Sequence, residues 1–505
     1  MRRMLRRHEV TSLSPERSGQ LNFTPQQVDR LSKQLVGSLV LPQDANYHVD
    51  RTTFMNAFQH FPQIIIYCQG FSDVVQSIRF AQEVGLKPVC RCGGHSTAGY
   101  SVNDDMVIDV SGINYVRVDS GARMAWVGSG ANWARIYATL DLYGLHLPGG
   151  GCETVCAAGY MQGGGYSFTS QMFGMNCDQV VSFQMALADG RIVKASAQEN
   201  ADLFWAVRGG TGNNFGVLLE IEYRLREIGV LWGFGFKWPI EFADQAAAAA
   251  EALHVWQANF TGNRVPPNLG NEAILGHTTG PDKAMGPYFL IRGMFHGSEA
   301  ACREALEPLL RLMPDVEKYR DIWRSGTYTE LNEYLLAYPT EIPANVPNSA
   351  RSLAKSHILG RTLTIEECRA IIELYRASPN ADNFIGFEAY GGAVNAIAPD
   401  ANAFWHRTAS MDAFLFAFWL HESSRAAAEN YVSEFDRVMQ PLSNGCSYQN
   451  YPNRRIEDFG RAYFGGNLAR LLEVKKAYDP TNFFTFPQGF DAAASKDHLT
   501  AGQAH

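Results

Sequence analysis

The sequence lacks a long hydrophobic run, because no stretch reaches the roughly 18 apolar residues that a membrane-spanning helix requires. It has no basic tract beyond the arginines near its start, and a net charge of -8 argues against a nucleic-acid partner. Those arginines are followed by HEVTSLSPERSGQ, which is too polar for the apolar part of an export signal. We therefore expect a cytoplasmic protein that binds neither membranes nor nucleic acids.

Densely spaced cysteines are missing as well. The 9 cysteines are scattered along 505 residues, unlike those of a secreted disulfide scaffold, and their odd number leaves at least one thiol unpaired. We expect no metal site. A chain of this length exceeds what one hydrophobic core usually serves, so two domains are predicted. Glycine, in contrast, is plentiful, and many of its 46 residues gather in clusters.

The first part of the chain alternates short apolar strands with amphipathic helices. Thr24 is expected to cap a helix, residues 64–68 (IIIYC) read as a buried strand, and residues 71–85 read as a helix capped by Ser72. Residues 178–196 (DQVVSFQMALADGRIVKAS) predict two strands about an Asp-Gly turn. This alternation is typical of a mixed α/β unit.

From about residue 229 the pattern changes to aromatic-rich strands, with an Ala-rich helix expected at 243–260. Several strands with one face covered by helices predict an antiparallel sheet. After about residue 446 the pattern returns to that of the first part, and it ends in a helix before Asp479-Pro480. The whole chain is therefore predicted to have an α+β fold.

Three glycine clusters stand out in the first part. Residues 91–96 (RCGGHS) follow a predicted strand, and adjacent glycines there can turn backbone N–H groups toward one anion such as a pyrophosphate. The cluster is not the G-x-G-x-x-G of a Rossmann fold. Residues 149–155 surround a cysteine and precede a second glycine triplet, and residues 204–216 form the third cluster. Taken singly, each cluster is also compatible with an ordinary tight turn or a packed thiol.

In order, these clusters resemble the PCMH-type FAD-binding domain of the vanillyl-alcohol-oxidase class of flavoproteins, most of all its berberine bridge enzyme-like branch. The similarity covers about residues 45–225 and 445–490. Its C-terminal signature is present as Tyr463-Phe464-Gly465, Asn467, Arg470-Leu471, Tyr478-Asp479-Pro480, Asn482-Phe483 and Gln488. The resemblance implies an FAD domain of two α/β subdomains formed by 1–228 and 446–505, and a substrate domain of antiparallel sheet covered by helices at 229–445.

The resemblance also implies how FAD is held. In this branch the histidine of R-x-G-G-H-S bonds the flavin 8α-methyl group and the cysteine of G-x-C-x-T-V bonds C6, so His95 and Cys152 would attach FAD bicovalently. Val155 stands where the branch commonly has a small side chain beside the flavin, which suggests access for O2, although a core valine is the alternative. Cys156 departs from the family, which usually has glycine there. The other expected cofactor contacts are Arg91, Gly93, Gly94, Ser96, Gly159, Gly164, Gly165, Asn214, Gly216, Val217, Tyr463 and Asn467.

A base is needed to take the hydroxyl proton as an alcohol carbon loses hydride. Residues 448–451 (YQNY) resemble the family's Y-x-N-Y, whose second tyrosine is the base in several members, so Tyr451 is the first candidate and Tyr448 a second. A free phenol has a pKa of roughly 10, so Tyr451 would need nearby positive charge or hydrogen-bond donors. Arg454 and Arg455 follow it closely.

Substrate contacts are expected from the central domain. Tyr390 matches a family tyrosine that faces the flavin, which makes it a further catalytic candidate, and Glu388 would share its strand face. The carboxylate base of the alkaloid-cyclising members should fall shortly after Arg407. Residues 413 and 414 are apolar there, with Asp412 only nearby, which argues against a berberine-type ring closure.

These inferences predict a flavin-dependent oxidase, acting as a monomer or homodimer. It would oxidise an alcohol or hemiacetal of a sugar, glycoside or hydroxylated natural product and reduce O2 to H2O2. One alternative is an oxidative cyclase or dehydrogenase of secondary metabolism. Another is a flavin-binding module without turnover, although binding alone would not require Tyr451.

Overall fold

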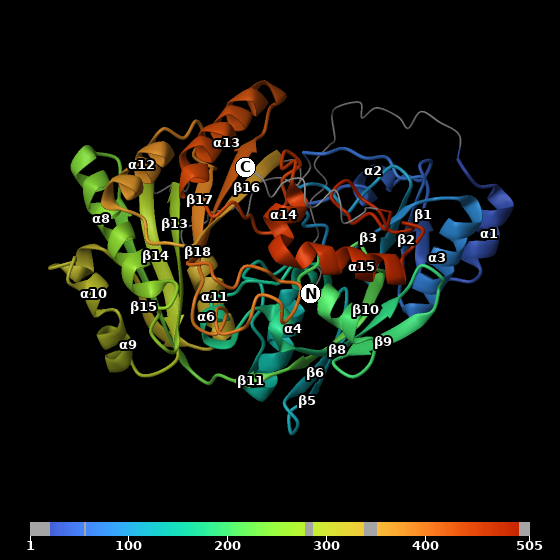
Figure 1. The fold of residues 1–505 in the computed structure, drawn as a ribbon, viewed down its shortest axis with the longest axis horizontal. Helices are drawn as coiled ribbons and strands as arrows, with labels where there is room; N and C mark the ends of the chain where they lie inside the picture. The colour runs from blue at the N-terminus through green and yellow to red at the C-terminus, as the bar shows by residue number, and fades with distance from the viewer. Residues whose placement is uncertain (1–20, 55–56, 278–285, 338–350, 494–505) are drawn as a thin grey trace.

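The computed structural model describes residues 21–54, 57–277, 286–337 and 351–493, which form three main β-sheets with helices around them (Figure 1). The N-terminal sheet has the strand order β1-β2-β4-β3. Its strands are β1 (Ser38–Val40), β2 (Ile64–Tyr67), β3 (Pro88–Arg91) and β4 (Met106–Asp109). The parallel pairing of β2, β4 and β3 requires a crossover, which helix α3 (Phe71–Val84) provides.

Two helices pack beside this sheet, and the sequence predicts both. Helix α1 (Pro25–Ser32) begins after Thr24, whose side chain and Gln27 form a reciprocal capping box. Helix α3 begins earlier than expected, because its N-cap is the extended Gly70, which places Ser72 inside the helix. The Ser72 cap is therefore wrong. A short helix, α2 (Tyr47–Asp50), precedes β2.

A second sheet, with the order β5-β6-β10-β8-β9, is antiparallel. Its strands are β5 (Val116–Asp119), β6 (Met124–Gly128), β8 (Val180–Ala186), β9 (Ile192–Ser196) and β10 (Val217–Arg224). The predicted pair of strands in 178–196 is confirmed as β8 and β9. The helices of this part are α4 (Trp133–Leu140), α5 (Ala157–Gln162), α6 (Ser170–Phe173) and α7 (Ala201–Val207). A small pair, β7 (Leu145–His146) and β11 (Arg226–Glu227), leads into the next sheet.

The third sheet, called here the large sheet, has the order β15-β12-β14-β13-β17-β18-β16, and all its printed pairings are antiparallel. Its strands are β12 (Leu231–Pro239), β13 (Leu269–His277), β14 (Pro287–Phe295), β15 (Arg320–Gly326), β16 (Arg351–Leu359), β17 (Phe384–Ala389) and β18 (Met411–Trp419). The sequence pattern did not predict β15 and β16, which are more polar than their neighbours.

Helices cover one face of the large sheet. In Figure 1 helices α8, α12 and α13 lie along its outer side, away from the N-terminal sheet. The helices of this part are α8 (Ala243–Phe260), α9 (Glu299–Ala305), α10 (Glu307–Leu310), α11 (Tyr328–Ala337), α12 (Ile365–Arg376) and α13 (Arg425–Met439). The apolar side chains between sheet and helices form one buried cluster that includes Trp256, Ile371 and Phe435. The opposite face of the sheet is therefore left to face the rest of the molecule.

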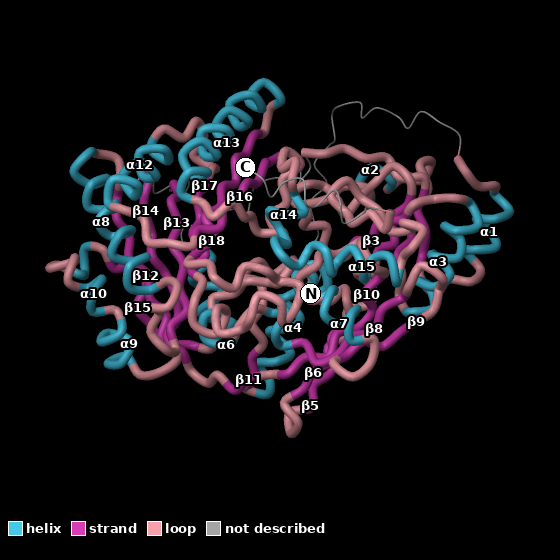
Figure 2. The backbone as a smooth tube through the Cα atoms, in the orientation of Figure 1, coloured by secondary structure: helices cyan, strands magenta, loops and turns pink. Residues whose placement is uncertain are grey.

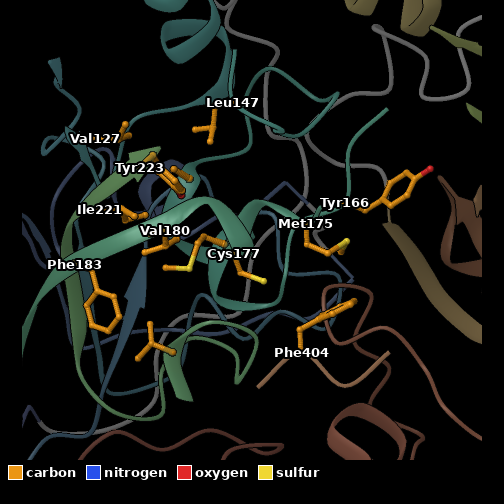
Figure 3. Packing of buried hydrophobic residues seen from close by; sticks show 14 of the residues in the cluster. Val127, Leu147, Tyr166, Met175, Cys177, Val180, Phe183, Ile221, Tyr223 and Phe404 are labelled. Atoms are coloured by element: carbon orange, nitrogen blue, oxygen red, sulfur yellow. The ribbon is translucent and has the colours of Figure 1, made fainter. Parts of the chain in front are cut away.

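The C-terminal segment returns to the first part of the chain, as Figure 2 shows, with helices α14 (Phe459–Phe464) and α15 (Leu468–Tyr478). Tyr448 and Tyr463 belong to the same buried cluster as the core of the second sheet. Figure 3 shows part of that cluster, with Val127, Ile221 and Tyr223 packed together. The α+β class is as predicted, whereas the domain boundaries at 228/229 and 445/446 stay a prediction. No helix among the described residues is long and apolar enough to cross a membrane.

Candidate functional site

A cavity of about 430 Å³ lies where the three parts of the fold meet. One wall comes from the loops after β3 and before α5, which contain the first two glycine clusters. Another wall comes from the open face of the large sheet, through Glu272, Arg292, Glu388 and Phe414. Residues 448–452 close the space between them. The cavity therefore brings together segments that are far apart in the sequence.

His95 and Cys152 converge on one threonine in this cavity. His95 Nε2 lies 3.0 Å from Thr154 Oγ1, and Cys152 Sγ lies 3.6 Å from the same oxygen. Both residues line the cavity, and Cys152 is exposed. The two loops also touch through their backbones, because a Cβ atom built on Gly93 would lie only 2.8 Å from the Thr154 carbonyl oxygen. Glycine at this position lets the loops approach each other.

Burial controls the charge of His95. Desolvation lowers its pKa to about 4, so the imidazole is neutral at neutral pH. The ring stacks on Phe54, with 4.3 Å between the ring centroids. Phe54 in turn packs against an aromatic cluster on the large sheet that contains Phe414 and Phe416. His95 is therefore uncharged, oriented, and connected through Phe54 to the opposite wall.

Glycines and unpaired polar groups make the cavity suitable for a flat cofactor with a phosphate tail. Of the predicted contacts, the following line it: Gly93, Gly94, Ser96, Val155, Gly159, Gly216 and Tyr463. Gly94 has a φ of +69°, a conformation that favours glycine. The hydroxyl of Tyr100 is buried in the wall without a hydrogen-bond partner among the described residues. The residues present therefore fit FAD, since they provide a backbone cradle and a free polar group.

Several predicted cofactor contacts are not on the cavity wall. These are Arg91, Gly164, Gly165, Asn214, Val217 and Asn467. Their polar groups hold the fold instead. Arg91 forms a buried ion pair of 2.5 Å with Asp109, and Asn214 accepts a hydrogen bond from Phe490 N. Asn467 donates to the carbonyl of Pro399.

The base candidate Tyr451 is hydrogen-bonded to a carboxylate of the large sheet. Its hydroxyl donates to Glu388 Oε1 at 2.6 Å, and its ring stacks on Phe414 with 4.6 Å between centroids. Burial and the adjacent Glu388 raise the pKa of Tyr451 well above its ordinary value. Glu388 Oε2 has no hydrogen-bond partner in the described part of the chain, and Glu388 lines the cavity. The pair therefore offers a second, unused carboxylate oxygen.

Strand register aligns three acidic residues and one arginine across the large sheet. Cross-strand pairing joins Arg292 to Glu272, Glu272 to Glu388, and Glu388 to Asp412. Arg292 and Glu272 form an ion pair of 2.7 Å. Burial and the charge of Asp412 raise the pKa of Glu388 well above its ordinary value. Burial alone raises the pKa of Asp412 to about 8.

The remaining candidates around the base are placed differently from expectation. Tyr390 follows the end of β17, is fully buried, stacks on Tyr166 at 5.6 Å, and does not line the cavity. Its roles as a catalytic group and a substrate contact therefore stay a prediction. Arg454 bonds the carbonyl of Ala98 and Arg455 pairs with Glu429, so neither is seen to contact Tyr451.

Tyr448 lies in the wall, but its hydroxyl is already used. It accepts hydrogen bonds of 3.0 Å from Gly165 N and from Asn450 Nδ2. Its ring meets that of Tyr451 edge-on, with 5.2 Å between centroids. The geometry therefore favours Tyr451 over Tyr448 as the base.

Other residues of the site were not identified from the sequence. Three of them, Phe54, Glu272 and Arg292, have no glycine cluster or motif around them, whereas Thr154 lies in the second glycine cluster. Glu272 and Arg292 are brought together by strand register, which depends on the whole sheet. Thr154 could have been noticed, because it lies between Cys152 and Val155 in a recognised segment.

Comparison with known proteins agrees with this arrangement. A family model for an FAD binding domain matches residues 62–196, and a model described as berberine and berberine like matches residues 447–490. An uncharacterised FAD-linked oxidoreductase of Bacillus subtilis, YvdP, is 30% identical over 468 residues, covering 90% of this chain and 98% of that protein. The protein is an FAD-linked oxidoreductase. Within this class, the chain belongs to the berberine bridge enzyme-like family.

Two further relatives extend the comparison. A carbohydrate oxidase of Microdochium nivale is 26% identical, covering 89% of this chain and 91% of its own. The solved structure of Physcomitrella patens BBE-like 1 superposes with a TM-score of 0.81 and 23% identity, over 93% of this chain and 100% of that one. The second likeness establishes the PCMH-type fold, with its substrate domain of antiparallel sheet covered by helices.

Proposed function

We propose that the protein oxidises an alcohol or hemiacetal group of a carbohydrate or glycoside and uses O2 as electron acceptor. The observation that carries this proposal is the hydrogen bond of 2.6 Å between Tyr451 and Glu388 at the cavity wall. Removal of hydride from an alcohol carbon requires a group that takes the hydroxyl proton. Tyr451 and Glu388 together provide such a group.

The pairing with Glu388 lets Tyr451 take part in proton transfer although the pKa of Tyr451 is raised. A phenol that donates a hydrogen bond to a carboxylate does not ionise readily, because the carboxylate next to it already carries a negative charge. Tyr451 can instead take the substrate proton while it passes its own proton to Glu388 Oε1. The proton moves one group further, and the phenol is neutral before and after the step. Glu388 is then the final acceptor, and Tyr451 the residue that touches the substrate.

Bound FAD would supply the acceptor for the hydride and the means of reducing O2. The cofactor would be held by backbone groups of Gly93 and Gly94 and by the side-chain hydroxyl of Tyr100. We further propose that it is bicovalently attached through His95 and Cys152. Support comes from their convergence on Thr154 and from the neutral imidazole of His95, whose unprotonated nitrogen can act as a nucleophile.

A carbohydrate fits the chemistry of the opposite wall. Glu272, Arg292 and Glu388 provide charged acceptors and donors in one row, which suits a ring that carries several hydroxyl groups. Phe384, Phe414 and Phe416 form an aromatic surface beside this row, against which the C–H face of a sugar can pack. The similarity to a carbohydrate oxidase supports the same substrate class.

A peroxide-coupled screen tests the substrate class. Mono- and oligosaccharides, glycosides and hydroxylated aromatic compounds are supplied in air, and H2O2 is measured. Turnover of saccharides or glycosides with stoichiometric H2O2 supports the proposal. Turnover only with an artificial electron acceptor would make the protein a dehydrogenase, and a product with a new C–C or C–N bond would make it an oxidative cyclase.

Replacement of Tyr451 tests the proton transfer. Tyr451→Phe keeps the ring on Phe414 and removes the hydroxyl, so anaerobic flavin reduction should slow by roughly 10²–10⁴-fold, the usual range of general-base catalysis. Tyr390→Phe is the matched control, because its hydroxyl is buried without a hydrogen-bond partner among the described residues and Tyr390 does not line the cavity. A large loss in Tyr390→Phe with little change in Tyr451→Phe would reverse the assignment.

A further inference from the structure

The glycine triplet before Cys152, residues 149–151, is held by side chains of two helices. The Tyr137 hydroxyl of α4 donates to the carbonyl oxygen of Gly150 at 2.9 Å. Asn332 Nδ2 of α11 donates to the carbonyl oxygen of Gly151 at 3.2 Å. Consecutive backbone carbonyls therefore receive donors from different parts of the fold, since α4 belongs with the second sheet and α11 with the large sheet.

The next two carbonyl groups of the loop are held by backbone donors. Val155 N donates to the carbonyl of Cys152 at 3.2 Å, and Ala134 N donates to that of Glu153 at 3.1 Å. Each carbonyl from residue 150 to 153 thus has a hydrogen-bond donor. The backbone of Cys152 is therefore fixed, although the residue itself is exposed.

Asn332 is the side-chain donor nearest to the cysteine. It is buried, and the carbonyl that it contacts belongs to the peptide bond between Gly151 and Cys152. Because a peptide group is planar, a fixed Gly151 carbonyl also fixes the backbone nitrogen of Cys152. Asn332 therefore acts directly on the peptide group from which the Cys152 side chain departs.

One face of α11 contacts the whole glycine triplet. Tyr328, Asn332 and Leu336 follow one another at intervals of four residues, which places them on the same side of the helix. The Tyr328 hydroxyl lies 3.4 Å from the carbonyl oxygen of Gly149. A Cβ atom built on Gly151 would lie 2.6 Å from Leu336 Cδ1, so the helix and the loop are in close contact.

The same helix is joined to the opposite wall of the cavity. Arg292 lines the cavity, and its Nη1 donates to the carbonyl of Leu335 at 2.6 Å. Leu336, the next residue of α11, lines the cavity as well. Helix α11 therefore connects the wall that is proposed to contact the substrate with the loop that carries Cys152.

We propose that Asn332 is a positioning residue that directs Cys152 toward its bond with FAD. This inference rests on the bicovalent attachment proposed above. It adds a residue that lies outside the segments 62–196 and 447–490, which the family models match. Asn332 would therefore make a helix of the large-sheet part necessary for complete attachment of the cofactor.

The bond itself would join Cys152 Sγ to the flavin carbon C6. The thiol proton and the hydrogen on that carbon are lost, and two electrons are released. The electrons pass through the flavin to O2, which takes up two protons and leaves as H2O2. Asn332 exchanges no proton or electron in this step and only holds the peptide group before the cysteine.

Replacement of Asn332 tests the proposal with attachment, not turnover, as the readout. Asn332→Leu keeps a branched side chain and removes the donor. Only a minor fraction of Cys152 should then carry FAD, because a misplacement of about 1 Å can slow a reaction by roughly 10²-fold. The bond at His95 should form as in the wild type. Mass spectrometry of the alkylated and digested holoenzyme measures both linked fractions, and unlinked Cys152 appears as an alkylated peptide.

Two variants on the same helix serve as comparisons. Asn332→Gln keeps an amide donor and should retain more of the Cys152 linkage than Asn332→Leu. Glu333→Gln changes an exposed neighbour and should have wild-type linkage at both sites. After acid denaturation, Asn332→Leu should stay yellow, and its visible spectrum should match that of Cys152→Ala.

A wild-type fraction of linked Cys152 in Asn332→Leu would overturn the proposal and leave bicovalent attachment intact. An equal loss of both linkages would overturn it as well, because Asn332 would then serve folding and not the position of one cysteine. If Cys152 carries no FAD in the wild type, bicovalent attachment is refuted and this proposal with it. Oxidation of an alcohol is tested independently by the peroxide-coupled screen.

Discussion

The Tyr451 hydroxyl donates a hydrogen bond of 2.6 Å to Glu388 Oε1, which joins the C-terminal segment to β17 of the large sheet. The two residues are 63 positions apart. The contact raises the pKa of Tyr451 and makes a free phenolate unfavourable. In the proposed mechanism Glu388 is therefore the proton acceptor, and Tyr451 is the group that transfers the proton.

The first prediction follows from this transfer. Glu388→Gln keeps the size of the side chain but cannot accept a proton, so flavin reduction should slow by about the same roughly 10²–10⁴-fold as in Tyr451→Phe. Because both residues act in one step, the double variant should be little slower than either single variant. If the double variant is slowed by the product of the two single-variant factors, the two residues act separately. Stopped-flow reduction under anaerobic conditions measures all three rates.

The same pair predicts a pH dependence. The reaction requires the Glu388 carboxylate, and burial and Asp412 raise its pKa, so the rate of reduction in the wild type should rise as pH increases through this raised value. Because the pKa of Asp412 is itself raised to about 8, its carboxyl is charged only above that pH, and Asp412→Asn should move to lower pH the part of the rise that lies there. A rate profile that stays in place would mean that Asp412 does not act on Glu388.

The mode of attachment gives another prediction. If FAD is attached bicovalently as proposed, acid-precipitated wild-type protein should stay yellow. His95→Ala or Cys152→Ala should each leave one bond, and the double variant should release FAD on denaturation. Cys156→Ala, four residues after Cys152, should keep both bonds. An unmodified Cys152 peptide in mass spectra of the wild type would contradict bicovalent attachment.

The position of Val155 leads to a prediction about how fast O2 reoxidises the reduced enzyme. It lies in the cavity wall beside Cys152 and is only partly buried. Val155→Leu should slow reoxidation by O2 and leave anaerobic reduction by substrate nearly unchanged, whereas Val155→Ala should keep reoxidation at least as fast. Equal losses in both half-reactions of Val155→Leu would indicate disturbed packing.

Local sequence signals predicted the parts of the fold that depend on neighbours in the chain. The capping box of Thr24 and Gln27 lies within one helical turn, and the strands β8 and β9 are joined by a short turn. The glycine loop that carries His95 is likewise a contiguous motif. Such features need no knowledge of the rest of the molecule.

The features that the sequence did not predict depend on pairing between segments that are distant in the chain. Whether Arg454 points at Tyr451 depends on a contact with Ala98, from a different part of the chain. The row from Arg292 to Asp412 exists only when four strands pair in one register. The end of β17 at Ala389, one residue before Tyr390, is a further detail that the sequence pattern did not predict.

The last prediction concerns stability and follows from Asp412. In the folded protein burial raises its pKa to about 8, whereas an unfolded aspartate has a pKa of about 3.9. Between these values the folded state holds a proton that the unfolded state releases, so this group destabilises the protein as pH rises, by up to about 1.4 kcal/mol per pH unit. The asparagine in Asp412→Asn stays neutral. The free energy of unfolding of this variant should therefore increase relative to that of the wild type from pH 5 to pH 8.

A second carboxylate provides a control of opposite sign. Hydrogen bonds from His357 and Lys355 lower the pKa of Asp436 to about 2, so its stabilising effect is complete above the unfolded pKa and is lost only as pH falls toward 2. Asp436→Asn should therefore lower the free energy of unfolding at neutral pH. Urea denaturation of both variants and the wild type at several pH values measures these differences. If the Asp412→Asn and wild-type curves run parallel from pH 5 to pH 8, Asp412 is ionised in the folded protein, and its effect on Glu388 must be a direct charge repulsion.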